Sequence, residues 1–203
     1  MTYQLDTAPA EEPIDLADAK AHIRVDHTDE DTVIGNLITL ARRMVEHDAM
    51  RQLVTATWKL YRDKFPTRHF QDSERVIEIT KPPLQSVASV EYYDADGTLQ
   101  TFASSKYHVD AVSSPGRIVL KNGQTWPVVE TGRPNAVVIT FDAGYGDAAD
   151  VPEEAKHAIR LLVGHWYENR EAAAIGAIGK EIEFSYTSFI QKLAWTAHQK
   201  VEV

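Results

Sequence analysis

The stretch that decides the fold runs from residue 29 to residue 61 and reads DEDTVIGNLITLARRMVEHDAMRQLVTATWKLY. Its apolar residues first recur every three or four positions, and after residue 53 they recur every second position. The first period is that of a helix with one buried face, and the second is that of a half-buried strand. The chain is therefore predicted to change from helix to strand near residue 54. The helical side chains expected in the core are Val33, Ile34, Leu37, Ile38, Ala41, Met44 and Val45.

A shorter helix is predicted upstream, over residues 15–24. Asp15 suits the N-cap, and Asp18 stands at the third helical position, where an acidic side chain is favourable. Residues 1–13 contain two prolines and small polar side chains, which predict an extended arm and not a helix. Residues 14–53 are accordingly expected to form the first part of a helical core.

Downstream of the switch, residues 54–146 are predicted to form a small, mostly antiparallel β unit. The segment 94–97, Asp-Ala-Asp-Gly, is a strong turn signal between two apolar runs, so the runs on either side of it are expected to pair as a hairpin. The predicted strands cover residues 54–61, 76–79, 87–93, 99–102, 107–109, 117–120 and 136–141.

Helical spacing returns after Pro152 and gives a third core helix within residues 147–171. Gly164 lies inside it at a cost of about 1 kcal/mol relative to alanine, which indicates a close approach by another helix. Residues 172–203 begin with an Ala/Gly-rich joint and are expected to be a flexible C-terminal tail that ends in a short amphipathic helix. The fold class is α+β, with the β unit inserted between core helices.

The composition is that of a soluble globular protein, with 43% apolar and 25% charged residues. No apolar run is long enough for a transmembrane helix, so no membrane partner is expected. The chain has no cysteine, which excludes disulfides and thiolate metal sites. Its first residues do not resemble a signal peptide, and synthesis in the cytoplasm is predicted.

The net charge of −9 is concentrated near the N-terminus. The first 31 residues carry nine acidic side chains against two basic ones. Such a surface repels phosphate, which argues against conventional DNA binding. Two interpretations remain open, a solvated face that aids solubility or an acidic wall past which DNA slides without binding. The second interpretation concerns Asp26, Asp29, Glu30 and Asp31.

No motif for catalysis is found, and no catalytic residue, metal site or cofactor is predicted. The Gly-Tyr-Gly run at 144–146 lacks the spacing and the lysine of a phosphate-binding loop. His165 and Glu168 are three positions apart, as some metal ligands are, and Glu46 and His47 on the second helix are conceivable partners. The motif is weak, and a polar cluster at a helix end is the expected interpretation.

Two sets of side chains are predicted to contact partners. Trp126, in a loop flanked by proline and glycine, is the best candidate for an exposed contact. The tail helix carries large apolar side chains, each of which gains about 1.5–3 kcal/mol when buried. A partner could bury them, or the helix could fold back on its own core. These tail residues are Phe184, Tyr186, Phe189, Ile190, Leu193 and Trp195.

Three stretches, residues 12–26, 81–97 and 141–171, together resemble the head–tail connector (adaptor) family of long-tailed phages, which also occurs in gene transfer agents. The resemblance covers roughly residues 12–171. It implies a ring, typically of twelve copies, beneath the portal vertex of the capsid in the neck of the particle. Such a ring extends the DNA channel without specific DNA binding and presents a docking surface to the stopper and tail.

In this family the helices build the ring and the C-terminal segment grips the portal, which places portal binding in residues 172–203. The exposed contact expected of Trp126 would be with a neighbouring subunit, and the acidic wall of Asp26, Asp29, Glu30 and Asp31 would face the channel. The expected partners are further copies of the chain, the portal protein and the stopper, and synthesis is expected in the bacterial cytoplasm.

An alternative from another class is a monomeric small-ligand or carbohydrate-binding module that uses the β unit. It predicts a concave pocket lined by aromatic side chains from residues 58–126, with the tail packed on the core of its own chain. An enzyme is not expected.

Overall fold

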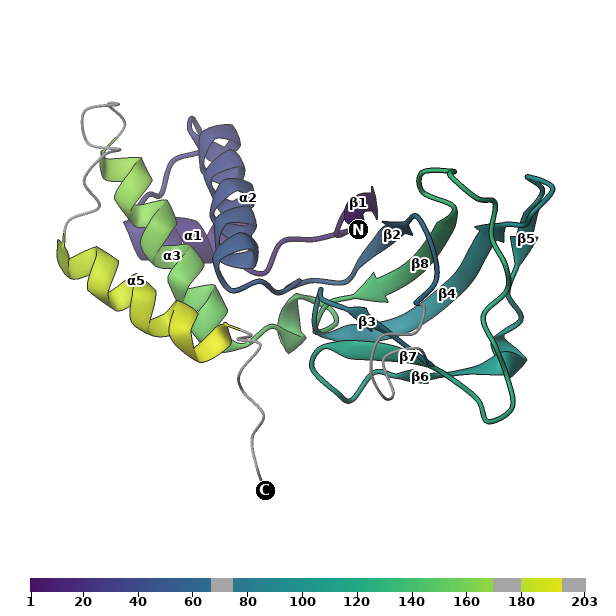
Figure 1. Ribbon diagram of the computed structural model, residues 1–203. Coiled ribbons are helices and arrows are strands. Elements are labelled where there is room, and N and C mark those ends of the chain that lie inside the picture. Colours follow the sequence, from purple (N-terminus) through teal and green to yellow (C-terminus); the bar gives the residue numbers. More distant parts are fainter. Residues whose placement is uncertain (67–74, 170–179, 195–203) are drawn as a thin grey trace, which may run out of the picture. The chain divides into compact units, whose positions relative to one another are not determined.

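The computed structural model describes residues 1–66, 75–169 and 180–194, without the side chains of 180–184. These residues form two compact units, each with its own hydrophobic core (Figure 1). The β unit comprises residues 1–9 and 55–144, and the helical unit comprises residues 10–54 and the described residues from 145 onward. The predicted α+β class is confirmed. In the part of the chain described here, no helix is long and apolar enough to cross a membrane.

Four α-helices make up the described helical unit: α1 (Leu16–Ile23), α2 (Asp31–Asp48), α3 (Glu153–Glu168) and α5 (Lys180–Leu193). The first begins as predicted, because the Asp15 carboxylate accepts a hydrogen bond of 2.7 Å from the backbone N–H of Asp18. Helix α3 packs against α1, α2 and α5. Helix α1 lies next to Gly164, but a Cβ there would be 3.6 Å from the His22 ring, which is an ordinary van der Waals distance. An alanine would therefore also fit, and the packing of α1 on α3 does not require the glycine.

The β unit contains two antiparallel sheets that share one core (Figure 1). The five-stranded sheet has the order β1-β2-β8-β4-β5, and the three-stranded sheet has the order β3-β7-β6. The strand predicted at residues 136–141 is the central strand β8, along which buried and half-buried residues alternate. The strands are β1 (Thr2–Thr7), β2 (Ala56–Arg62), β3 (Val76–Ile79), β4 (Leu84–Tyr93), β5 (Leu99–Thr101), β6 (Tyr107–Asp110), β7 (Gly116–Leu120) and β8 (Val137–Ala143).

The N-terminal residues differ from the extended arm expected for them. Thr2–Thr7 pair with β2 as the edge strand of the larger sheet. Tyr3 holds this strand in place, because its ring packs edge-on against Phe141 and its hydroxyl accepts a hydrogen bond of 2.8 Å from the backbone N–H of Thr80. One anchoring aromatic residue is too little periodic signal to reveal a strand in the sequence.

The predicted hairpin between residues 87 and 102 is confirmed, since β4 pairs with β5 across the Asp94–Gly97 turn. The Asp94 carboxylate accepts hydrogen bonds from the backbone N–H groups of Thr98, at 2.9 Å, and Asp96, at 3.1 Å. The bond from Thr98, followed by that from the Gln100 amide, lowers the pKa of Asp94. Gly97 has a φ of 76°, which a glycine adopts without strain.

Candidate functional site

The residues considered as metal ligands serve the packing of the helical unit. His165 is buried, and its Nδ1 lies 3.3 Å from the side-chain nitrogen of Asn169. The Glu46 carboxylate accepts hydrogen bonds from Arg42, at 2.8 Å, and Gln52, at 2.6 Å. Among the described residues, no group of three or more histidine, aspartate or glutamate side chains could hold a metal ion.

A buried network of charges centres on Arg42, which is only 7% exposed. Its guanidinium donates to Glu12, with Nε 2.6 Å from Oε2, and to Glu46 one turn along α2. Burial alone disfavours this charge, but the hydrogen bond to Glu12 and the charge of Glu46 outweigh it and raise the pKa of Arg42. Glu46 also accepts from Gln52 and from the backbone N–H of Leu53. The network therefore fixes the segment before α1 and the chain that leaves α2.

The four acidic residues predicted to line a channel divide into two pairs. Asp26 and Asp29 are exposed. Asp31 forms an ion pair of 2.7 Å with Lys20, and Glu30 accepts a hydrogen bond from the hydroxyl of Tyr167. The second pair therefore has a structural role within the helical unit, and only the first is wholly available to a neighbouring molecule.

The apolar face of α5 packs into the core of the helical unit. Tyr186, Ile190 and Leu193 are all less than 9% exposed, and Phe189 packs half-buried against the His157 ring. In the isolated chain the tail helix thus follows the alternative expectation of folding back on its own core. While α5 stays in place, these side chains are not free for a partner. The side chain of Phe184 and the whole of Trp195 lie outside the described residues.

Polar contacts from α2 and the turn after it also hold α5. The Tyr186 hydroxyl donates a hydrogen bond of 2.8 Å to the Asp48 carboxylate, and the Arg51 guanidinium donates to the backbone carbonyl of Leu193 at 2.5 Å. These two hydrogen bonds and the buried apolar face together attach α5 to the rest of the helical unit.

The hydroxyl of Tyr186 gives the attachment of α5 a pH dependence. Burial, and then the hydrogen bond to Asp48 and its charge, raise the pKa of Tyr186. Unfolded tyrosine ionises near pH 10, whereas the folded side chain stays neutral there, so its contribution to stability is complete below about pH 10 and is lost as the pH rises further. Thermal unfolding between pH 8 and 11 should show a steeper alkaline loss for the wild type than for Tyr186→Phe. Equal slopes would contradict this prediction.

Trp126 packs inside the β unit. Its ring stacks on Phe65, with ring centroids 4.8 Å apart, and lies 5.3 Å from Phe102. The side chain is half-buried, so part of it stays accessible, and the expected contact with a neighbouring subunit remains a prediction. Proline and glycine next to Trp126 indicate a loop correctly, but the two phenylalanines that cover it come from distant parts of the sequence.

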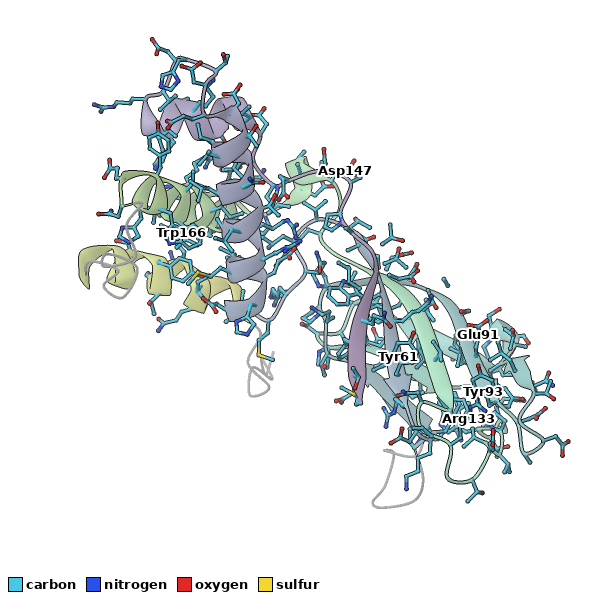
Figure 2. All side chains as sticks on the ribbon, turned by 90° about the horizontal axis from the view of Figure 1, so that it is seen from above. Tyr61, Glu91, Tyr93, Arg133, Asp147 and Trp166 are labelled. Atoms are coloured by element: carbon cyan, nitrogen blue, oxygen red, sulfur yellow. The ribbon has the colours of Figure 1, made fainter. Side chains whose placement is uncertain are left out.

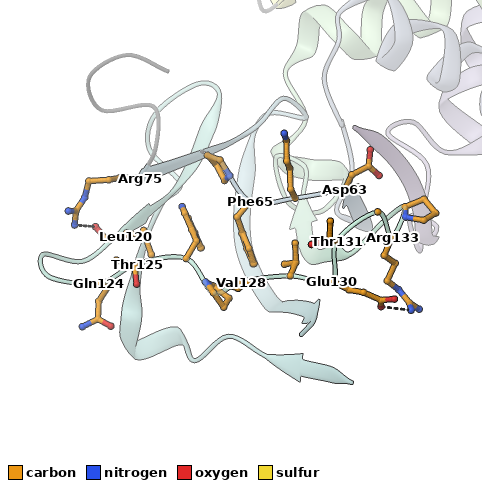
Figure 3. Close-up of a pocket in the computed structure, with 17 residues that line it drawn as sticks. Asp63, Phe65, Arg75, Leu120, Gln124, Thr125, Val128, Glu130, Thr131 and Arg133 are labelled. Carbon is orange, nitrogen blue, oxygen red and sulfur yellow. Dashed lines mark hydrogen bonds and ion pairs between the residues drawn. The ribbon is translucent and has the colours of Figure 1, made fainter. Parts of the chain in front are cut away.

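A pocket of about 950 Å³ lies beside this aromatic stack, lined by residues 63–66 and 124–134 together with Arg75 and Leu120 (Figure 3). Asp63, Arg75, Glu130 and Arg133, four of the charged residues that line it, already have partners within the chain. Arg75 donates to the carbonyls of Leu120 and Lys121. Arg133 pairs with Glu130 at 3.0 Å and lies over the ring of Tyr93 (Figure 2). Phe65 and Trp126 form an aromatic wall of the pocket, and the paired charged groups hold its loop in place.

Sequence reasoning missed an exposed apolar surface on α2. Val33 and Leu40 are 45% and 53% exposed, while Leu37 and Met44 are partly buried. The prediction that Val33 faces the core is wrong, because the buried face is centred on Ile34, Ile38, Ala41 and Val45. The sequence holds a signal for this surface, since residues 33, 37, 40 and 44 follow a separate spacing of four, three and four.

The chain was compared with protein families, curated proteins and solved structures. Residues 13–112 match the family model of the phage gp6-like head-tail connector protein. No curated protein matches the sequence. A chain in the neck of an empty gene transfer agent particle, computed with C6 symmetry, has a TM-score of 0.76 and 20% identity over 97% of this chain and 96% of that one.

Two further structures give the same identity and coverage. One is the virion of a native gene transfer agent particle, with a TM-score of 0.76, and the other is the neck of the native particle computed with C12 symmetry, with a TM-score of 0.75. At this identity the likeness demonstrates a shared fold. The match over residues 13–112 includes α1, α2 and strands β2 to β6, and it covers two of the three stretches that suggested the family. The third stretch, residues 141–171, lies outside the matched range. The resemblance to the phage head–tail connector family is thereby confirmed over residues 13–112, which are 100 of the 203 residues of the chain.

Proposed function

We propose that this protein is a structural adaptor in the neck of a tailed phage or gene transfer agent. Copies of the chain form a ring of twelve under the portal vertex, extend the DNA channel and offer a docking surface to the stopper and tail. The match to the connector family over residues 13–112 carries the proposal. The fold shared with neck chains in structures computed with C6 and C12 symmetry supports the ring, because both symmetries are those of closed rings. Such a protein works by burying surface, without catalysis.

The experiment for this proposal combines the purified chain with portal rings of the same particle. Electron microscopy should show an additional ring on one face of the portal, with a continuous central channel. A chain that stays unbound at saturating concentration, with the portal intact, would overturn the proposal.

A second candidate function, a monomeric small-ligand or carbohydrate-binding module, is favoured by one observation, the pocket beside Phe65 and Trp126. Sedimentation analysis with and without portal separates the two functions. The adaptor should sediment with the portal, whereas the binding module should remain a monomer in both samples.

Portal attachment is proposed to use residues 172–203, and the structure constrains how this could occur. The apolar face of α5 already packs in the helical unit. Docking through Tyr186, Phe189 or Ile190 therefore requires α5 to leave the core of its own chain and to pack against the portal. Deletion of the tail is an ambiguous test, because it also removes buried side chains from the helical unit. A test that keeps α5 intact is needed.

Cross-linking α5 to α3 provides such a test. The natural chain has no cysteine, so the double variant His157→Cys/Phe189→Cys offers only two thiols to a short bis-maleimide. These two rings are in contact, with centroids 4.9 Å apart, which such a linker can span. The cross-linked protein should fail to bind portal, and the same variant without linker should bind. Equal binding by both forms would show that α5 stays on α3 and that other residues grip the portal.

The acidic residues near α2 are proposed to face the channel. Asp26→Asn with Asp29→Asn removes two exposed charges without touching the Lys20–Asp31 ion pair or the Tyr167–Glu30 hydrogen bond. Rings assembled on portal from this variant should retain double-stranded DNA more strongly than wild-type rings, and the difference should shrink as salt rises. Glu154→Gln, at an exposed position of α3, is the matched control. DNA retention equal to that of wild-type rings at low salt would place these residues outside the channel.

A further inference from the structure

Helix α2 has apolar side chains on two faces, one of which is buried while the other is only partly covered. The inner face, Ile34, Ile38, Ala41 and Val45, is almost fully buried. The other four residues, Val33, Leu37, Leu40 and Met44, form the outer stripe. Leu40, in the middle of the helix, is 53% exposed, and Val33 is 45% exposed. Neither position is needed to build the core of the helical unit.

The geometry of the outer stripe fits an elongated apolar partner. Its residues are separated by four, three and four positions, which is the spacing that helices use to pack side chains against another helix. At 1.5 Å per residue, the stripe extends for about 17 Å along α2. Alongside the stripe, between residues 32 and 47, the exposed side chains of α2 include no acidic one, although the chain carries a net charge of −9 and the last residue of α2, Asp48, is an exposed acid. They are Thr32, Val33, Asn36, Leu40, Arg43 and His47.

We propose that the outer stripe is a surface by which one copy of this chain packs against the next copy in the ring, an inference that rests on the proposed function. Copies of an acidic chain repel one another, and contact is least costly where a surface carries no negative charge. The outer stripe is such a surface, and Arg43 beside it can face acidic groups of the adjacent copy. In a ring each copy contributes two different surfaces to its two neighbours, and the stripe supplies one of them.

The size of the stripe agrees with a contact that forms only within a ring. Two half-exposed and two partly buried side chains offer far less than the roughly 1,200 Å² that a stable pair of free proteins buries. On a portal, neighbouring copies are held at high effective concentration, so the same small contact becomes strong enough to order the ring. The stripe therefore predicts a chain that is monomeric in solution and binds the portal cooperatively.

The test compares Val33→Asp/Leu40→Asp with Val112→Asp, which places an aspartate at a 99% exposed valine of the β unit. Wild-type chain titrated onto portal tests the proposed function itself: if it does not bind, the ring proposal fails before the stripe is tested. If the wild-type chain binds, the Val33→Asp/Leu40→Asp variant should fill portals without cooperativity. Its apparent affinity for the portal should be weaker than that of the wild type by about tenfold or more. The control should behave as wild type, and circular dichroism verifies that both variants fold.

Two results would overturn the inference. One is assembly of complete rings by the stripe variant with the midpoint and cooperativity of the control. The other is a complete loss of portal binding, including that of the first copy, which would show that the stripe meets the portal and not a second copy of this chain. Mass photometry of the portal complexes distinguishes these results, since it counts the copies bound to each portal.

Discussion

Arg42→Ala is expected to lower the free energy of unfolding of the helical unit by about 3–5 kcal/mol, the usual cost of breaking a buried ion pair. The substitution leaves the carboxylates of Glu12 and Glu46 facing each other without the guanidinium between them. It also removes the Arg42–Glu12 contact between the segment before α1 and the middle of α2, where only the hydrogen bond from the Thr39 hydroxyl to Glu12 then remains among the described side-chain contacts of Glu12. Chemical denaturation followed by the circular dichroism of the helices measures the effect.

Two controls make this result interpretable. Arg43→Ala changes the neighbouring arginine, which is exposed, and should alter stability by no more than about 0.5 kcal/mol. The triple variant Arg42→Met/Glu12→Gln/Glu46→Gln removes the three charges together and should recover part of the loss, because no carboxylate is then left unpaired. A loss in Arg43→Ala as large as that in Arg42→Ala would show that the network is not the cause.

The sequence predicted those elements whose cause is local. Asp15 caps α1 through a backbone group three residues away, and the turn at Asp94–Gly97 is formed by its own side chain and one glycine. The alternation along β8 is likewise contained in seven consecutive residues. In each case the interacting groups are neighbours in the chain, so the pattern of residue types is sufficient.

Contacts between distant segments could not be predicted in this way. Tyr3 meets Thr80, and Trp126 stacks on Phe65, but nothing near these residues in the sequence identifies the partner. The same limit applies to the candidate surfaces. The spacing in α2 shows which side chains lie on one line, yet only the packing of α1 and α3 shows which line is covered. For α5, the sequence identified an apolar face without deciding between a partner and its own core.

Loosening α5 is expected to strengthen portal binding, the opposite of what a destabilising substitution usually does. Asp48→Ala with Arg51→Ala removes the acceptor of the Tyr186 hydroxyl and the donor to the Leu193 carbonyl, while every residue of α5 remains unchanged. Each lost hydrogen bond is worth about 0.5–1.5 kcal/mol, so the fraction of chains with α5 detached should rise by about tenfold or more. If only the detached form docks through α5, apparent portal affinity rises by the same factor.

Portal titrations with the double variant and with Glu168→Ala, an exposed change on α3, measure this effect. The control should bind as wild type does. Unchanged or weaker binding by the double variant would mean that α5 keeps its place when the chain attaches, and portal recognition would then have to use surfaces that are already exposed. A gain in affinity that the cross-link between positions 157 and 189 abolishes would instead identify the detached helix as the docking element. Binding would then rise when the attachment of α5 is weakened by substitution and fall when it is fixed by a covalent bond.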